Sequence, residues 1–200
     1  MPSVYDLKPA FQNLLRPLVA ALARMGVTAN QVTLLAVLLS CAAGAALWLQ
    51  PGAGWPLLLI PAVLFARMAL NAIDGMLARE HDMQTALGAI LNELGDVFSD
   101  AALYLPFAAL AGVSAHWVVL LVLLAVISEM TGVVAVQIGA SRRYDGPMGK
   151  SDRAVLFGAI ALLAGLGVAL PWLDYVFIAA LLLSLLTIFN RARGALRELG

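Results

Sequence analysis

The chain has 200 residues, of which 62% are apolar and only 12% charged, and its formal net charge is zero. Soluble domains carry charges on about 25% of their residues, so this composition excludes a soluble globular protein. It predicts an all-α integral membrane protein. We expect one domain, with residues 1–27 as a juxtamembrane helix and residues 28–200 as a transmembrane core.

The segment before the first apolar run is amphipathic. As a helix, residues 7–26 would have one apolar face and one polar face. Pro17 is expected to kink this helix. We expect this helix to lie in the membrane interface; a short buried helix is the alternative. Asp6 and Lys8 interrupt any apolar core at the start, so no signal peptide is expected.

Six apolar runs follow, and a helix of about 20 such residues crosses the hydrocarbon core. We therefore expect six transmembrane helices. They lie near residues 31–50, 56–78, 85–111, 115–140, 153–170 and 173–190. The single cysteine, Cys41, excludes a disulfide framework and a cysteine metal site. We expect it to be a small packing residue.

The basic residues occur in alternate connections. The loops near residues 51–55, 112–116 and 171–174 contain neither lysine nor arginine. Because basic residues stay on the cytoplasmic side, both termini are expected there. The basic residues expected on this cytoplasmic side are Lys8, Arg16, Arg24, Arg79, Arg142, Arg143, Lys150, Arg153, Arg191, Arg193 and Arg197.

Polar side chains form a stripe on each of the second and third apolar runs. A charge near the bilayer centre costs ~2.5–3.5 kcal/mol on insertion scales, so these groups need a partner or a function. Two facing stripes would form an oxygen-rich cage that suits Mg²⁺ or Mn²⁺ rather than zinc. The stripes are Arg67, Asn71, Asp74 and Ala78, and Glu93, Asp96 and Asp100 with Asn92 at the edge.

The spacing of these residues resembles the signature of the CDP-alcohol phosphatidyltransferase family, D-x-x-D-G-x-x-A-R-x8-G-x-x-x-D-x-x-x-D. The matching residues are Asp74, Gly75, Ala78, Arg79, Gly88 and Asp96. Asn71 and Asn92 stand where the signature has its first and third aspartates.

The resemblance implies an enzyme of phospholipid biosynthesis, similar to phosphatidylglycerophosphate and phosphatidylinositol phosphate synthases. It would transfer a phosphatidyl group from CDP-diacylglycerol to a small alcohol, release CMP and use Mg²⁺ or Mn²⁺. It implies that Asp74 is a metal ligand, that Asp96 is a metal ligand and the general base, and that Asn71 and Asn92 are neutral metal ligands. Arg79 would contact phosphate. Gly75, Ala78 and Gly88 complete the implied nucleotide and phosphate set.

The segment before the first span is similar to the family's T-P-N-x-x-T, which faces the cytidine end of the donor. Thr28, Asn30 and Thr33 match it, and Ala29 replaces the proline. The resemblance implies nucleotide contact for these residues. A second interpretation is that Thr28 or Asn30 caps the first span, and both roles can coexist.

The loop at residues 141–153 carries Arg142, Arg143, Lys150 and Arg153 beside two glycines. Similar loops in the related synthases bind the acceptor, so the resemblance implies a phosphorylated acceptor. Glycerol phosphate is the first expectation, inositol phosphate the second, and serine or another polar alcohol the third. A basic loop that meets anionic lipid headgroups is the alternative.

The asparagines leave three outcomes open. Glu93 or Asp100 compensates, a single metal suffices, or the transfer activity is lost. A CDP-lipid-binding protein or transporter without turnover and a lipid phosphohydrolase therefore remain alternatives. For Arg67 we expect an ion pair with Glu129 rather than a substrate contact.

The resemblance also implies a homodimer, membrane lipids as partners and no nucleic acid. A bacterial inner membrane is expected, with the active site on the cytoplasmic side.

Overall fold

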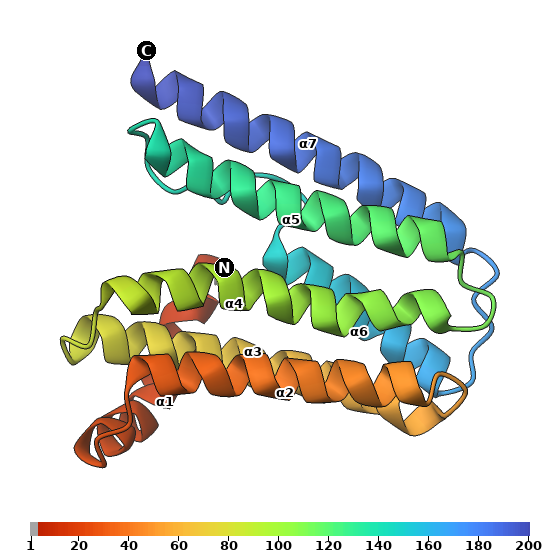
Figure 1. Cartoon of the computed structure of the whole chain (residues 1–200), viewed down its shortest axis with the longest axis horizontal. Helices are drawn as coiled ribbons and strands as arrows, with labels where there is room; N and C mark the ends of the chain where they lie inside the picture. The colour runs from red at the N-terminus through yellow and green to blue at the C-terminus, as the bar shows by residue number, and fades with distance from the viewer. Residues whose placement is uncertain (1–3) are drawn as a thin grey trace. The chain divides into compact units, whose positions relative to one another are not determined.

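The computed structural model describes residues 4–200, which form seven α-helices and one 3-10 helix (Figure 1). Residues 1–3 of the expected N-terminal helix lie outside the described residues. The helices are α1 (Val4–Arg24), α2 (Ala29–Leu49), α3 (Gly54–Glu80), α4 (Ala86–Tyr104), η1 (Leu105–Ala109), α5 (Ala115–Gln137), α6 (Lys150–Gly165) and α7 (Leu173–Leu199).

The prediction of an all-α membrane protein is confirmed. Four of the described helices also have the length and composition of transmembrane spans. Among the described helices, α2, α3, α5 and α7 are long and apolar enough to cross a bilayer. The helix α4 carries Glu93, Asp96 and Asp100 within 19 residues, and α6 has only 16 residues. The apolar criterion therefore identifies four of the six expected spans.

The chain divides into two compact units. The first unit comprises Met1–Ala42 and Ala62–Ser99, and the second comprises Ala43–Pro61 and Asp100–Gly200. The first unit holds α1, the beginning of α2, the later part of α3 and most of α4. The second unit holds η1 and α5 to α7 together with the remaining ends of α2, α3 and α4.

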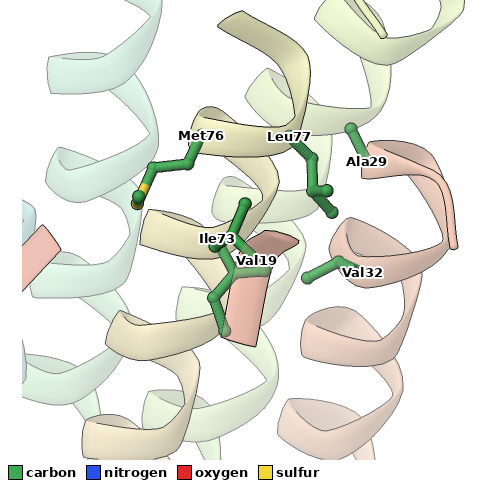
Figure 2. Packing of buried hydrophobic residues seen from close by; sticks show 6 residues of the cluster. All are labelled: Val19, Ala29, Val32, Ile73, Met76 and Leu77. Atoms are coloured by element: carbon green, nitrogen blue, oxygen red, sulfur yellow. The ribbon is translucent and has the colours of Figure 1, made fainter. Parts of the chain in front are cut away.

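In the first unit α1 packs on α3 through one fully buried side chain, Val19 (Figure 2). Val19 contacts a small apolar cluster that includes Ile73 and Leu77, which flank Asp74 in α3. Leu14 is 75% exposed on the same helix. The helix is thus half-covered, as its amphipathic sequence predicts, and it is not a buried helix. Its helical conformation continues through Pro17.

In the second unit α5 and α7 run side by side and in the same direction (Figure 1). An aromatic cluster fills the core at the end of α4. The rings of Tyr104 and Phe157 stack with centroids 4.1 Å apart, and Phe107 meets Phe157 edge-on at 5.0 Å.

The third apolar run is not one continuous α-helix. The helix α4 ends at Tyr104 and continues as the 3-10 helix η1, because Pro106 has no N–H to donate to the carbonyl of Ala102. The backbone of α2 approaches this carbonyl closely at Gly44, where a Cβ would overlap the Ala102 oxygen. Cys41, expected to pack, is exposed instead.

We predict that Gly44→Ala destabilises the protein. In a helix interior alanine is ordinarily better than glycine by about 1 kcal/mol, but here its methyl group meets the Ala102 carbonyl. Overpacking of this kind costs about 1–3 kcal/mol, so thermal unfolding in detergent should begin at a lower temperature. Gly52→Ala is the control, because nothing lies within 4 Å of a Cβ there. A Gly44→Ala variant as stable as the parent would contradict the close approach.

Candidate active site

A pocket of about 360 Å³ opens in the first unit between α2, α3 and α4. It brings together residues that are up to 63 positions apart in sequence, from Ala29 to Asn92. The residues that line it are Ala29, Asn30, Thr33, Asp74, Gly75, Ala78, Arg79, Met83, Gln84, Thr85, Gly88, Ala89 and Asn92. Eight of these were singled out in the sequence.

Asp74 is the buried carboxylate of this pocket. It is 4% exposed, and the Thr33 hydroxyl lies 2.8 Å from its Oδ2 atom. The same hydroxyl lies 3.1 Å from the carbonyl oxygen of Ala29. Thr33 therefore fixes the orientation of Asp74 from α2, a role that the sequence resemblance did not assign to it.

The two signature glycines make room for polar side chains. A Cβ at Gly75 would lie 2.9 Å from the Arg79 guanidinium, which is folded back over that turn of α3. At Gly88 a Cβ would lie 2.6 Å from Oδ1 of Asn30 and 2.9 Å from Oγ1 of Thr85. Larger residues at these positions would displace the pocket's own side chains.

Thr85 is a pocket residue that the sequence analysis missed. It precedes the first residue of α4 and accepts a hydrogen bond from the backbone N–H of Gly88 at 2.9 Å, as an N-cap does. The Asn30 amide donates to the same Thr85 oxygen at 3.4 Å. A threonine just before a helical run was the available signal. Met83 and Gln84 had no comparable signal.

Thr28 caps α2 rather than lining the pocket. Its Oγ1 accepts from the N–H of Gln31 at 3.3 Å, and the Gln31 side chain accepts from the N–H of Thr28 at 2.9 Å. This reciprocal pair is a capping box. Within the TANQVT segment, capping and pocket contact therefore fall on different residues, since Asn30 lines the pocket.

The four residues expected to hold metal are divided into two pairs. Asp74 and Asn92 line the pocket. Asn71 and Asp96 instead bond to each other, with Nδ2 of Asn71 donating to Oδ1 of Asp96 at 3.1 Å. Among the described residues no three His, Cys, Asp or Glu side chains form a group that could hold a metal ion. A cage of carboxylates is thus not present there, and amide or ligand oxygens would have to complete a metal site.

Arg67 also reaches Asp96. Its Nη2 donates to the backbone carbonyl of Asp96 at 3.0 Å and lies 3.4 Å from Oδ1. The side chain of Arg67 is 3% exposed and that of Asp96 is 28% exposed. The expected pair of Arg67 with Glu129 stays a prediction.

In the second unit, Glu129 of α5 gathers three arginines. Arg142 and Arg153 lie 3.0 Å from its carboxylate oxygens, and Arg191 lies 3.3 Å away. Arg153 also pairs with Asp100 at 2.9 Å and is 1% exposed. Glu129 and Asp100 thus both lie against guanidinium groups. The sequence analysis did not recognise Arg191 as a site residue. Because Arg191 follows the last apolar run, it was used only to orient the chain in the membrane.

The basic loop is packed against α5 and α7. A Cβ at Gly132 would overlap the Arg142 guanidinium, so this glycine provides the space for that side chain. Gly146 has φ +119°, and a Cβ there would lie 2.6 Å from Cα of Thr187. The backbone N–H of Met148 donates to the Thr187 hydroxyl at 2.9 Å. The loop is therefore a fixed part of the unit.

The remaining basic side chains of the loop are closer to solvent. Arg143 contacts Asp145 at 2.8 Å and Glu198 at 2.9 Å. The hydrogen bond from Arg143 lowers the pKa of Asp145. Lys150 begins α6, whose first turn is capped by the bond from the Gly149 N–H to the Asp152 carboxylate at 2.9 Å.

Comparison with known proteins identifies a family. Residues 26–187 match the model of the CDP-alcohol phosphatidyltransferase family. The chain is 48% identical to the Escherichia coli K12 inner membrane protein YnbA over 201 residues, which covers 97% of this chain and 96% of YnbA. An uncharacterized protein of Aquifex aeolicus is 36% identical over 104 residues, which covers 52% of this chain and 49% of that protein.

The fold is that of a solved synthase. The Mycobacterium tuberculosis phosphatidylinositol phosphate synthase PgsA1, crystallised with manganese and citrate, superposes with a TM-score of 0.77 at 21% identity, covering 92% of this chain and 90% of that one. A second structure of PgsA1, with CDP-DAG bound, gives a TM-score of 0.70 at 21% identity and covers 91% of each chain. This similarity supports the expected all-α membrane fold.

We predict that Glu129→Gln strongly destabilises the protein. The change removes a negative charge that faces three arginines, two of which are almost fully buried. Loss of one partner from a buried ion pair costs about 3–5 kcal/mol, and thermal unfolding should reveal it. The control is Glu198→Gln, whose partly exposed carboxylate pairs with Arg143 and should contribute no more than about 1 kcal/mol. Equal effects of the two changes would refute the assigned role of Glu129.

Proposed function

The chain belongs to the CDP-alcohol phosphatidyltransferase family, and we propose that it transfers the phosphatidyl group of CDP-diacylglycerol to a small alcohol and releases CMP. One observation carries the proposal. The pocket of the first unit gathers Asp74, Arg79 and Gly88 of the signature with Asn30 of the preceding segment. Such a convergence of polar groups in one concave site is typical of a ligand pocket.

The donor diphosphate fits the wall formed by α3. Gly75 and Ala78 have small or no side chains, so a ligand can approach the backbone of α3 closely at these positions. The Arg79 guanidinium lies over Gly75. A guanidinium binds phosphate oxygens in a bidentate manner. Asn30 and Thr85 would then meet the nucleotide end, where their amide and hydroxyl groups offer both donors and acceptors.

A divalent cation fits the same pocket, because Asp74 and Asn92 bring a carboxylate and an amide oxygen to its wall. Mg²⁺ and Mn²⁺ prefer such oxygen ligands, and PgsA1 was crystallised with manganese. When bound, the cation would neutralise negative charge on the diphosphate and on the leaving CMP.

The chain's own residues would handle the acceptor and its proton. The hydroxyl oxygen of the alcohol forms a bond to the lipid-side phosphorus, and the bond from that phosphorus to the bridging oxygen breaks. CMP departs with the electron pair. The Asp96 carboxylate takes the hydroxyl proton; it is 28% exposed and is oriented by Asn71 and Arg67.

The acceptor in this proposal is a phosphorylated alcohol, with glycerol phosphate ahead of inositol phosphate. The loop at residues 141–153 brings Arg142, Arg143, Lys150 and Arg153 together, and guanidinium and ammonium groups bind phosphate oxygens through charge-assisted hydrogen bonds. Arg153 is 1% exposed, so Arg142, Arg143 and Lys150 would make the first contacts with the phosphate, while Arg153 would hold the cluster together.

The proposed setting is a bacterial inner membrane, where YnbA is placed by its name. We propose six spans, with α4 and α6 added to the four apolar helices. Each would be shielded by its neighbours, since the charges of α4 include Asp100, which is paired with Arg153. Both termini and the pocket would face the cytoplasm, with α1 in the interface. A homodimer is part of the same proposal.

We predict that the purified protein releases CMP from CDP-diacylglycerol only when Mg²⁺ or Mn²⁺ and one particular acceptor are present. Asp96→Asn should lower the rate by about 10²–10⁴-fold, the usual contribution of a general base. Asp82→Asn is the matched control, because Asp82 is an exposed loop residue with φ 54° that asparagine also adopts readily.

The alternatives give different results in the same assay. CMP release without any acceptor would identify a phosphohydrolase. Binding of CDP-diacylglycerol without CMP release under any condition would identify a non-catalytic binding protein and reject the transferase. Loss of activity in Asp82→Asn as deep as in Asp96→Asn would remove the specific role of Asp96.

A further inference from the structure

A second pocket, called the apolar pocket below, lies in the second unit at the end of α6. Its volume is about 580 Å³. It lies between three connections, those from α2 to α3, from η1 to α5 and from α6 to α7. Because α6 begins in the basic loop and ends at this pocket, the two are separate sites within the unit.

The side chains that form the wall of the apolar pocket all lack polar groups. The described residues that line it are only glycine, alanine, proline, valine, leucine and isoleucine. Backbone donors of the connections are used within their own turns, since the N–H groups of Ala53, Val113 and Val168 donate to carbonyl oxygens at 3.1, 3.2 and 3.0 Å. Apolar cavities stay dry and take up apolar molecules, so the ligand that fits this wall is a hydrocarbon.

Two glycines fix one side of this pocket. A Cβ at Gly54 would lie 3.2 Å from the carbonyl oxygen of Gly165, and a Cβ at Gly165 would lie 2.9 Å from the Leu58 side chain. The start of α3 is therefore packed tightly against the end of α6. At Gly52, by contrast, nothing lies within 4 Å of a Cβ, so the connection from α2 to α3 has room for a larger group.

The depth of the apolar pocket in the membrane follows from the length of α6. This helix has 16 residues, and at a rise of ~1.5 Å per residue it spans about 24 Å, less than the ~30 Å of the hydrocarbon core. Its first turn contains Lys150 and Asp152, charges that belong outside the core. The other end of α6 therefore stops within the core, where lipid chains fill the space that a protein leaves open.

Tryptophans mark the same end of the unit. The chain has four, and each lies within four residues of a residue that lines the apolar pocket. They are Trp48, Trp55, Trp117 and Trp172. Tryptophan is enriched where membrane helices meet the interface. A phospholipid whose headgroup is at this interface thus has the pocket within reach of its chains.

We propose that the apolar pocket binds one acyl chain of a membrane phospholipid. The headgroup stays at the level of the tryptophans, and the chain enters between the three connections. A phospholipid is the occupant because the pocket lies at the ends of helices that cross a bilayer, which supplies acyl chains in excess over any dissolved apolar molecule. The inference rests on the proposed placement of α6 as a span and does not depend on the transferase activity.

The test is photolabelling of the full chain in nanodiscs of phosphatidylethanolamine and phosphatidylglycerol. A small fraction of the phosphatidylethanolamine carries a diazirine in the middle of one acyl chain, and mass spectrometry locates the labelled residues. We expect labels on Leu57, Ile160 and Leu173, which line the pocket and are at most 5% exposed. Bulk lipid reaches exposed side chains such as Leu120 and Leu123. Labels confined to exposed side chains would overturn the inference.

Two variants fill the apolar pocket from different connections. Gly52→Phe and Ala169→Phe each place a ring at a lining position whose φ is not positive. A ring that displaces even two methylene groups of the chain should lower labelling of the buried residues by about tenfold. Thermal unfolding shows that each variant is folded.

The matched control is Ala179→Phe, because Ala179 is exposed on α7 and is not a lining residue. Its labelling should equal that of the parent. A fall in either filling variant with an unchanged control supports the site. Unchanged labelling in both filling variants, or an equal fall in the control, would reject it.

Other occupants give other results. Labelling of the buried residues by a diazirine fatty acid, but not by the phospholipid, would identify a free fatty acid and reject the phospholipid. Loss of these labels when two chains share a nanodisc would identify a second copy of the chain as the occupant. The labels are read without turnover, so this inference and the release of CMP succeed or fail separately.

Discussion

Charges that lie within membrane helices must be neutralised by groups that the same protein supplies, and much of this structure follows from that requirement. A carboxylate in hydrocarbon has no water to solvate it. Asp96 is met by Arg67 in the first unit, and in the second unit Asp100 is met by Arg153. Each pair joins residues far apart in the chain, so satisfying the charges also fixes which helix segments pack together.

The same requirement applies to the polar groups of the pocket in the first unit. Where a carboxylate has an arginine partner, its charge is balanced within the protein and its position is fixed. Asp74 is oriented by the hydroxyl of Thr33 in a pocket that also contains Arg79 and Asn92. A pocket that holds both a carboxylate and a guanidinium is suited to ligands that bring their own charges, such as a cation and a diphosphate.

The sequence predicted the helices and most of the pocket, because both depend on local regularities. The signature spacing assigned Asp74, Arg79 and Gly88 to one site, and these three residues line the same pocket. The end of α4 at Tyr104 was missed, although Pro106 was available as a signal, because the apolar run continues past it. An apolar pattern reports burial, and it does not report which backbone hydrogen bonds are made.

The partners of the charged residues could not be predicted in this way. Spacing along one helix shows that Asp96 and Asn71 belong to polar stripes, but their mutual hydrogen bond depends on how two helices are rotated against each other. Arg191 pairs with Glu129, which lies 62 residues earlier in the chain. A basic residue after an apolar run is already explained by the cytoplasmic location of such residues, so its sequence position gave no indication of this partner. Tertiary packing decided both cases.

The position of Glu129 in the chain also bears on how the protein is made. All three of its arginines follow it in sequence, at positions 142, 153 and 191. During synthesis Glu129 is therefore made before each of these three arginines. The full set of ion pairs around Glu129 exists only once Arg191 of α7 has been made, so the last helix of the chain completes the surroundings of a charge in α5.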